Sequence, residues 1–270
     1  MVIDIHTHTF PEKIAAKTIQ YLKDKAGIKC YGDGKISGLE RSMEVAGVDI
    51  SVLMPVVTKP AQCQTINRVA AETTEQYAGR ARRLISFGGI HPDTPDYKDE
   101  LKRIRDLGLP GIKIHPAYQR VDIDDIRYKR IIDYAGGLGL WTDVHAGIDP
   151  GFPGEDHCSV ERLARLLTDV PGDRLILAHM GGVTDEDKTE ELLCTRDVWF
   201  DTAISVTYLP EERFIRLVRA RGSERVIYGT DWPWDDQKNS KNRLLSMALT
   251  QEEKDNILWR NGAAVLGLAL

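Results

Sequence analysis

The sequence opens with Met1-Val2-Ile3-Asp4-Ile5-His6-Thr7-His8, a short β-rich run that ends in two histidines. Similar short runs alternate with longer helical patterns along the rest of the chain. The candidate strands are residues 2–6, 49–57, 83–90, 110–115, 140–146, 174–179, 197–203 and 225–230. The helical patterns between them include residues 12–24, 62–77, 124–134, 160–167 and 211–219. Eight strands that alternate with helices predict parallel βαβ units, and eight is the number that closes a (β/α)8 barrel.

The length of 270 residues fits one α/β barrel, so we expect a single TIM-barrel domain over residues 1–270. An open doubly wound sheet is the main alternative fold, but no G-x-G-x-x-G motif follows the first strand. The turn-rich segment 27–38 reads as an insertion after that strand, and residues 259–270 as a closing helix. No linker, repeat or low-complexity tract divides the chain.

The composition argues against several classes of protein. The formal charge is −5 and the sequence pI is about 5.8, whereas a nucleic-acid binder normally has a basic surface. No apolar run approaches the length of a membrane-spanning helix. The four scattered cysteines contain no CxxC pair and predict reduced thiols, and a strand pattern that starts at residue 2 leaves no room for a secretory signal. We therefore expect a cytoplasmic protein.

Six of the seven histidines fall where a predicted strand ends. They are His6, His8, His91, His115, His145 and His179. In a barrel, the carboxyl ends of the strands form the active-site face, so these side chains should meet there. The seventh, His157, lies in the loop after the fifth strand.

Strand alternation predicts which of these side chains point into the barrel. On the first strand, Asp4, His6 and His8 share one face, and we expect Ile3 and Ile5 to face the helices. The same reasoning points Lys113, His115, Asp143 and His145 inward on the fourth and fifth strands. Inward imidazoles together with a carboxylate form a nitrogen–oxygen ligand set. Such a set favours zinc, with iron, manganese and cobalt as alternatives.

The order of these motifs resembles the amidohydrolase superfamily, and more closely its amidohydrolase 2 branch, which includes the aminocarboxymuconate-semialdehyde decarboxylase-like enzymes. The matching stretches are Ile3-Asp4-Ile5-His6-Thr7-His8, Gly111-Ile112-Lys113-Ile114-His115-Pro116, Val144-His145-Ala146, Ala178-His179-Met180-Gly181-Gly182 and Gly229-Thr230-Asp231-Trp232-Pro233. They extend across almost the whole chain, and their combination is more specific than any one of them.

The resemblance implies one divalent metal ion held by His6, His8, His145 and Asp231. It also implies that Asp231 accepts the proton of a metal-activated water, and that His179 polarises the substrate or holds that water. Binuclear members of the superfamily bridge two metals with a carbamylated lysine, so Lys113 leaves a second metal as an alternative. The resemblance is compatible with a homodimer, although no stretch of the sequence marks an interface.

Five residues are candidates for contact with the substrate: His91, Lys113, His115, Phe152 and Trp232. Each has a simpler structural alternative. The histidines could bond to loops, Lys113 could form a buried ion pair with Asp4 or Asp143, Phe152 could belong to a solvated loop, and Trp232 could pack under the final helix.

The expected activity is hydrolysis of a C–N or C–O bond in a small, carboxylated molecule. A non-oxidative decarboxylation at the same metal site is the first alternative, because both reactions would use one ligand set. A barrel that has lost catalysis and only binds metal or ligand is the second alternative.

Overall fold

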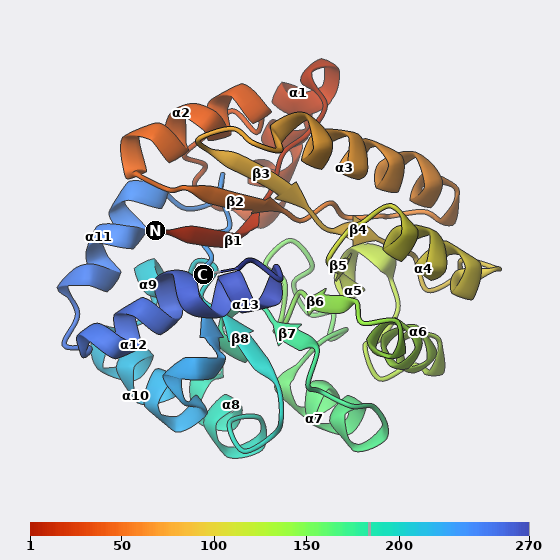
Figure 1. Cartoon of the computed structure of the whole chain (residues 1–270). Helices are drawn as coiled ribbons and strands as arrows, with labels where there is room; N and C mark the ends of the chain where they lie inside the picture. The colour runs from red at the N-terminus through yellow and green to blue at the C-terminus, as the bar shows by residue number, and fades with distance from the viewer. Residues whose placement is uncertain (183–184, 270) are drawn as a thin grey trace.

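A computed structural model describes residues 1–182 and 185–269 as one ring of parallel strands surrounded by helices (Figure 1). The strands are β1 (Ile3–Thr7), β2 (Ile50–Leu53), β3 (Arg83–Ser86), β4 (Gly88–Gly89), β5 (Gly111–Ile114), β6 (Trp141–Val144), β7 (Leu175–Leu177), β8 (Trp199–Asp201) and β9 (Val226–Ile227). Their pairing order is β1-β2-β3 and β4 through β9, parallel throughout.

Two contacts close this order into a barrel. The N–H of Ile5 donates to the carbonyl of Tyr228 at 2.8 Å, and Thr7 forms a parallel bridge with Trp232, so β1 lies beside the last strand. The predicted third strand, 83–90, is divided at Phe87 into β3 and β4, which together occupy one of the eight strand positions of the barrel. The predicted (β/α)8 barrel is confirmed.

The helices follow the strands as the sequence patterns indicated, with additions. They are α1 (Glu12–Ala26), α2 (Ile36–Ala46), α3 (Cys63–Tyr77), α4 (Tyr97–Asp106), α5 (Pro116–Gln119), α6 (Ile126–Gly137), α7 (Val160–Asp169), α8 (Glu186–Leu192), α9 (Ser205–Tyr208), α10 (Glu211–Arg221), α11 (Gln237–Ser246), α12 (Gln251–Asp255) and α13 (Asn261–Val265). The turn-rich insertion ends earlier than predicted, because α2 begins at Ile36. Among the residues that the structure describes, no helix has the length and apolar character needed to cross a membrane.

The outer side of the strands packs against the helices as predicted for the middle of the chain. Ile112, Ile114 and Val144 are fully buried in the large apolar cluster that also contains Leu101 of α4 and Ile131 of α6. Lys113 and Asp143, which alternate with these residues, bond to each other on the opposite side of the strands. The predicted inward orientation of both is therefore confirmed.

The prediction for the first strand was wrong for Ile3, Asp4 and Ile5, although His6 points inward toward Lys113 as predicted. Ile5 lies inside the barrel, in a cluster with side chains from β2, β6, β7 and β9 that Val265 of α13 covers. In the structure, α13 lies across this end of the barrel, beside the N-terminus (Figure 1). Ile3 packs against Ala263 of the same helix.

Asp4 points away from that interior. Its carboxylate accepts hydrogen bonds from the side chains of Thr230 and Gln237, the latter at the start of α11. Burial raises the pKa of Asp4 to about 7 in spite of these bonds. The cause of the error is a shift in the register between β1 and β2, which falls between Asp4 and Thr7 and breaks the alternation we assumed.

Candidate metal centre

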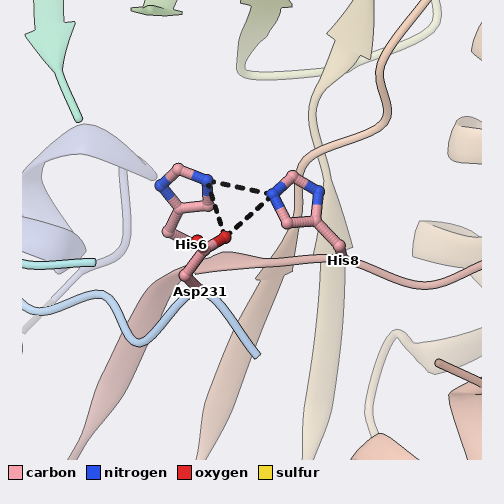
Figure 2. A group of neighbouring side chains, drawn as sticks. All are labelled: His6, His8 and Asp231. Atoms are coloured by element: carbon pink, nitrogen blue, oxygen red, sulfur yellow. Dashed lines mark hydrogen bonds and ion pairs between the residues drawn. The ribbon is translucent and has the colours of Figure 1, made fainter. Parts of the chain in front are cut away.

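Three of the four predicted ligands converge at the open end of the barrel. His6 and His8 come from the end of β1, and Asp231 comes from the loop after β9; their side chains point toward one another (Figure 2). The two Nε2 atoms are 3.2 Å apart, and Asp231 Oδ1 lies 3.1 Å from Nε2 of His8 and 3.6 Å from Nε2 of His6. Two ligands of a tetrahedral zinc ion, each bonded at 2.0–2.2 Å, would be separated by about 3.3–3.6 Å.

Neighbouring groups fix which ring nitrogen each histidine offers. Nδ1 of His8 lies 2.8 Å from the carbonyl of Met54, which can only accept a hydrogen bond, so this nitrogen carries a proton. Nδ1 of His6 lies 2.7 Å from the buried carboxylate of Asp201. Nε2 of both rings therefore faces Asp231. A divalent cation bound between them would have two imidazole nitrogens and one carboxylate oxygen as ligands.

The electrostatics of the site also suit a cation. Burial lowers the pKa of His6 well below its usual range, and the positive charge of Lys113 adds to this effect. Burial by itself would raise the pKa of Asp231, but the hydrogen bond from His8 and the electrostatic interaction with the neighbouring His6 outweigh it, and the pKa falls below its usual range. A neutral imidazole beside an ionised carboxylate is the form that binds metal.

The backbone is strained at this face of the barrel. Asp231, His179, Met180 and Ile204 have φ values between 53° and 68°, in the left-handed region that non-glycine residues seldom adopt. All four follow the end of a strand. Strained residues gather at functional sites, where the surrounding structure holds side chains in positions that a relaxed backbone would not give.

Lys113 forms one of the two ion pairs proposed for it. Its ammonium lies 2.5 Å from Asp143 Oδ1 and 3.2 Å from Nε2 of His6, and both charged residues are fully buried. The other predicted partner, Asp4, bonds elsewhere. Asp143 Oδ2 has no hydrogen-bond partner among the described residues. The buried pair sits directly below the proposed metal ligands, and a substrate-binding role for Lys113 remains a prediction.

His145 and His179, the other two histidines predicted to act at the metal, contact each other. His145 Nδ1 is 3.0 Å from Nε2 of His179, whose Nδ1 is 3.2 Å from the carbonyl of Ala203. The ring centroids of His179 and His6 are 5.4 Å apart, and the two ring planes are inclined by 37°. His145 does not belong to the group of His6, His8 and Asp231 in the described residues; it falls into a second group with His115 and Asp149. Its role as a fourth ligand therefore remains a prediction.

Three further candidates for substrate contact, Phe152, Trp232 and His91, have different surroundings. Phe152 is buried and packs edge-on against Tyr118, which packs in the same way against His115. Trp232 is buried in an apolar cluster with residues of α2 such as Leu39 and Met43. Nδ1 of His91 accepts the N–H of Asp93. The substrate roles of all three remain predictions.

Sequence reasoning left two carboxylates without a role. Asp201, at the end of β8, bonds His6 Nδ1 through Oδ2 and accepts the backbone N–H of His179 through Oδ1 at 3.0 Å. Asp149 faces His115 and His145 from the loop after β6. Asp201 could have been suspected because, like the histidines, it is a polar residue at the end of a strand. The position of Asp149 in a loop gave no comparable signal.

A glycine makes room for His6. A methyl group on Gly229 would lie 2.9 Å from Cβ of His6, a contact that requires the β1 backbone or the ring to move. We expect Gly229→Ala to cost about 1–3 kcal/mol in unfolding free energy and to lower the metal content by displacing His6. Gly136→Ala on α6 is the control, because nothing lies within 4 Å of its added methyl group. Elemental analysis and denaturant unfolding of both variants test this; equal metal content would contradict it.

Comparison with known proteins places the chain in a family. A family model described as amidohydrolase matches residues 3–268. The 4-sulfomuconolactone hydrolase of Hydrogenophaga intermedia is 24% identical over 222 residues, which cover 74% of this chain and 70% of that protein.

Two solved structures share the fold at low identity. The 5-carboxyvanillate decarboxylase of Novosphingobium aromaticivorans, solved with manganese, superposes with a TM-score of 0.76 at 15% identity, covering 99% of this chain and 96% of the other. The 2,6-dihydroxybenzoate decarboxylase from Rhizobium gives 0.73 at 15% identity, covering 98% of both chains. With the family match over nearly its whole length, the chain belongs to the amidohydrolase 2 family and has its TIM-barrel fold.

Proposed function

We propose that this protein is a metal-dependent hydrolase that uses water to cleave a C–O or C–N bond beside a carbonyl in a small, carboxylated molecule. The observation that carries the proposal is the convergence of His6, His8 and Asp231, whose ligand atoms face one another while each histidine's Nδ1 is engaged elsewhere. The hydrolase found by sequence similarity supports hydrolysis as the reaction.

The proposed ligands are His6, His8 and Asp231, with His145 as the fourth. The nitrogen–oxygen donor set fits zinc, and it also fits manganese, the metal in one structural neighbour. A divalent cation bound there would lower the pKa of a coordinated water to about 7, which supplies a nucleophile at neutral pH. The carboxylate of Asp231, which faces Nε2 of both histidines, would accept the proton of that water and pass it to the leaving group.

His179 is the proposed group for the substrate carbonyl. Its Nε2 faces the same space as the proposed ligands, and the carbonyl of Ala203 and the carboxylate of Asp201 hold its ring and backbone. We expect His179→Ala to lower turnover by about 10²–10³-fold while most of the metal is retained. His157→Ala is the control, since that ring bonds Asp122 and Glu155 in the loop. Unchanged turnover in His179→Ala would refute the assignment.

Decarboxylation is the second candidate, because the structural neighbours include a manganese-containing decarboxylase of an aromatic carboxylate. One experiment separates the two reactions. Metal-loaded protein is incubated in H₂¹⁸O with lactones, amides and hydroxybenzoates, and the products are identified by mass spectrometry. A product that carries one ¹⁸O and all its carbon supports hydrolysis. Loss of CO₂ without ¹⁸O supports decarboxylation and overturns the proposal. No turnover of any compound by protein with bound metal would favour a barrel that only binds.

A further inference from the structure

Asp149 is a buried carboxylate that the loop after β6 holds in one orientation. Its side chain is only 10% exposed. Oδ1 accepts the N–H of Gly151 at 2.7 Å, and its backbone carbonyl accepts the N–H of Phe152 at 3.0 Å. Because Oδ1 is committed to the turn, the direction of Oδ2 is set by the local backbone.

Oδ2 faces two imidazoles at once. It lies 3.4 Å from Nε2 of His115 and 3.5 Å from Nε2 of His145. The two rings are stacked, with centroids 3.9 Å apart and planes only 9° from parallel, and both present Nε2 to the same carboxylate oxygen. A carboxylate attracts an N–H and repels the lone pair of a bare ring nitrogen.

His145 is therefore oriented opposite to His6 and His8. In His6 and His8, Nδ1 is engaged with an oxygen and Nε2 faces the metal centre. In His145, Nε2 faces the oxygen of Asp149, and Nδ1 lies 3.0 Å from Nε2 of His179. One proton lies between these two nitrogens, and Nδ1 of His145 is bare when His179 carries it. The ligand atom of His145 would thus be Nδ1.

We propose that Asp149 is a positioning residue that holds His145 in the Nε2–H form, so that its bare Nδ1 is the atom offered to the metal. The proposal rests on the ligand role of His145 in the proposed function. A ring in the other tautomer would present a proton to the cation, and binding would first require that proton to move.

Two substitutions of Asp149 should have different effects. In Asp149→Asn, the N–H of Gly151 still requires an acceptor, so the amide oxygen takes the place of Oδ1 and the NH₂ group faces the two rings. That donor stabilises a bare Nε2 and shifts His145 to the Nδ1–H form. Asp149→Ala removes the partner without supplying a donor. We expect Asp149→Asn to weaken metal affinity by about 10–100-fold, and to weaken it more than Asp149→Ala does.

The ring protons are observed directly by ¹⁵N NMR of metal-free, ¹⁵N-histidine-labelled protein, and metal affinity is measured by competition with a chelator. His145→Ala identifies the signals of His145. We expect the Nε2–H form in the wild type and the Nδ1–H form in Asp149→Asn. Asp156→Asn, in the same loop but bonded to Ser159, is the control and should change neither quantity.

Either of two results overturns the proposal: an Nδ1–H form of His145 in the wild type, or equal tautomers and affinities in the Asn and Ala variants. The second is what a merely structural role for Asp149 would produce. His145→Ala separates this failure from failure of the proposed function. Full metal content in that variant refutes the ligand role, whatever tautomer Asp149 imposes.

Discussion

Asp231→Asn is expected to lower turnover by about 10²–10⁴-fold, because an amide cannot accept the proton that the carboxylate takes from water. The substitution preserves the size of the side chain. Asparagine also tolerates the left-handed backbone at this position, where φ is 68°, so the fold should be retained. Turnover is to be measured with saturating metal and with the substrate found in the ¹⁸O screen, because Asp231 is also a proposed ligand. Thermal unfolding checks the fold.

The control for this variant is Asp235→Asn. Asp235 is also buried and lies four residues further along the same loop, but it accepts a hydrogen bond from Thr207 and does not belong to the group with the histidines. We expect it to retain most of the turnover. Wild-type turnover in Asp231→Asn, or an equal loss in both variants, would show that the position of this carboxylate beside His6 and His8 has no special role.

His6→Asn is expected to abolish stoichiometric metal binding while the barrel stays folded. An asparagine amide reaches about as far as Nδ1 of histidine, so it can still donate to Oδ2 of Asp201, an oxygen that would otherwise be left buried and unpaired. It cannot replace Nε2, the atom that faces His8 and Asp231. His6→Ala removes both contacts and should also lose unfolding free energy, by about 1–3 kcal/mol. Elemental analysis in moles of metal per chain separates the two effects.

The metal content of the wild-type protein, measured in the same way, tests the proposed set of ligands. About one metal per chain supports the proposed site. About two would support a carbamylated Lys113, although the bond between its ammonium and Asp143 favours the one-metal design. No metal after reconstitution would refute a metal centre, and full occupancy in His6→Asn would refute the role of His6. His157→Ala controls for the loss of a histidine as such.

The barrel fold could be predicted from the sequence because the patterns that indicate it are local and recur along the chain. Alternation of short apolar runs with helical patterns recurs along the chain, and strand parity correctly oriented Lys113 and Asp143, where β5 and β6 pair without irregularity. The same rule failed at Asp4 and Ile5 because the register between β1 and β2 shifts there. Such a shift depends on how two strands pair across the fold, and no pattern within one strand reveals it.

The candidate site likewise has a part that the sequence predicts and a part that it does not. Its histidines could be predicted because each follows a strand whose end is known to face the open end of a barrel. The partners that fix their tautomers could not. Asp201 and His6 are 195 positions apart, and the Met54 carbonyl that bonds His8 is a backbone group with no signature in the sequence. The direction of Asp149 depends on a turn that Gly151 closes.

Asp201 has a consequence for how this site could evolve or be redesigned. One carboxylate holds the ring of His6 through one oxygen and the backbone of His179 through the other. A substitution at either histidine changes the surroundings of the other, so their effects should not add in a double-mutant cycle. We therefore expect the two positions to be epistatic, so a mutational library should vary both together with Asp201 rather than either one alone.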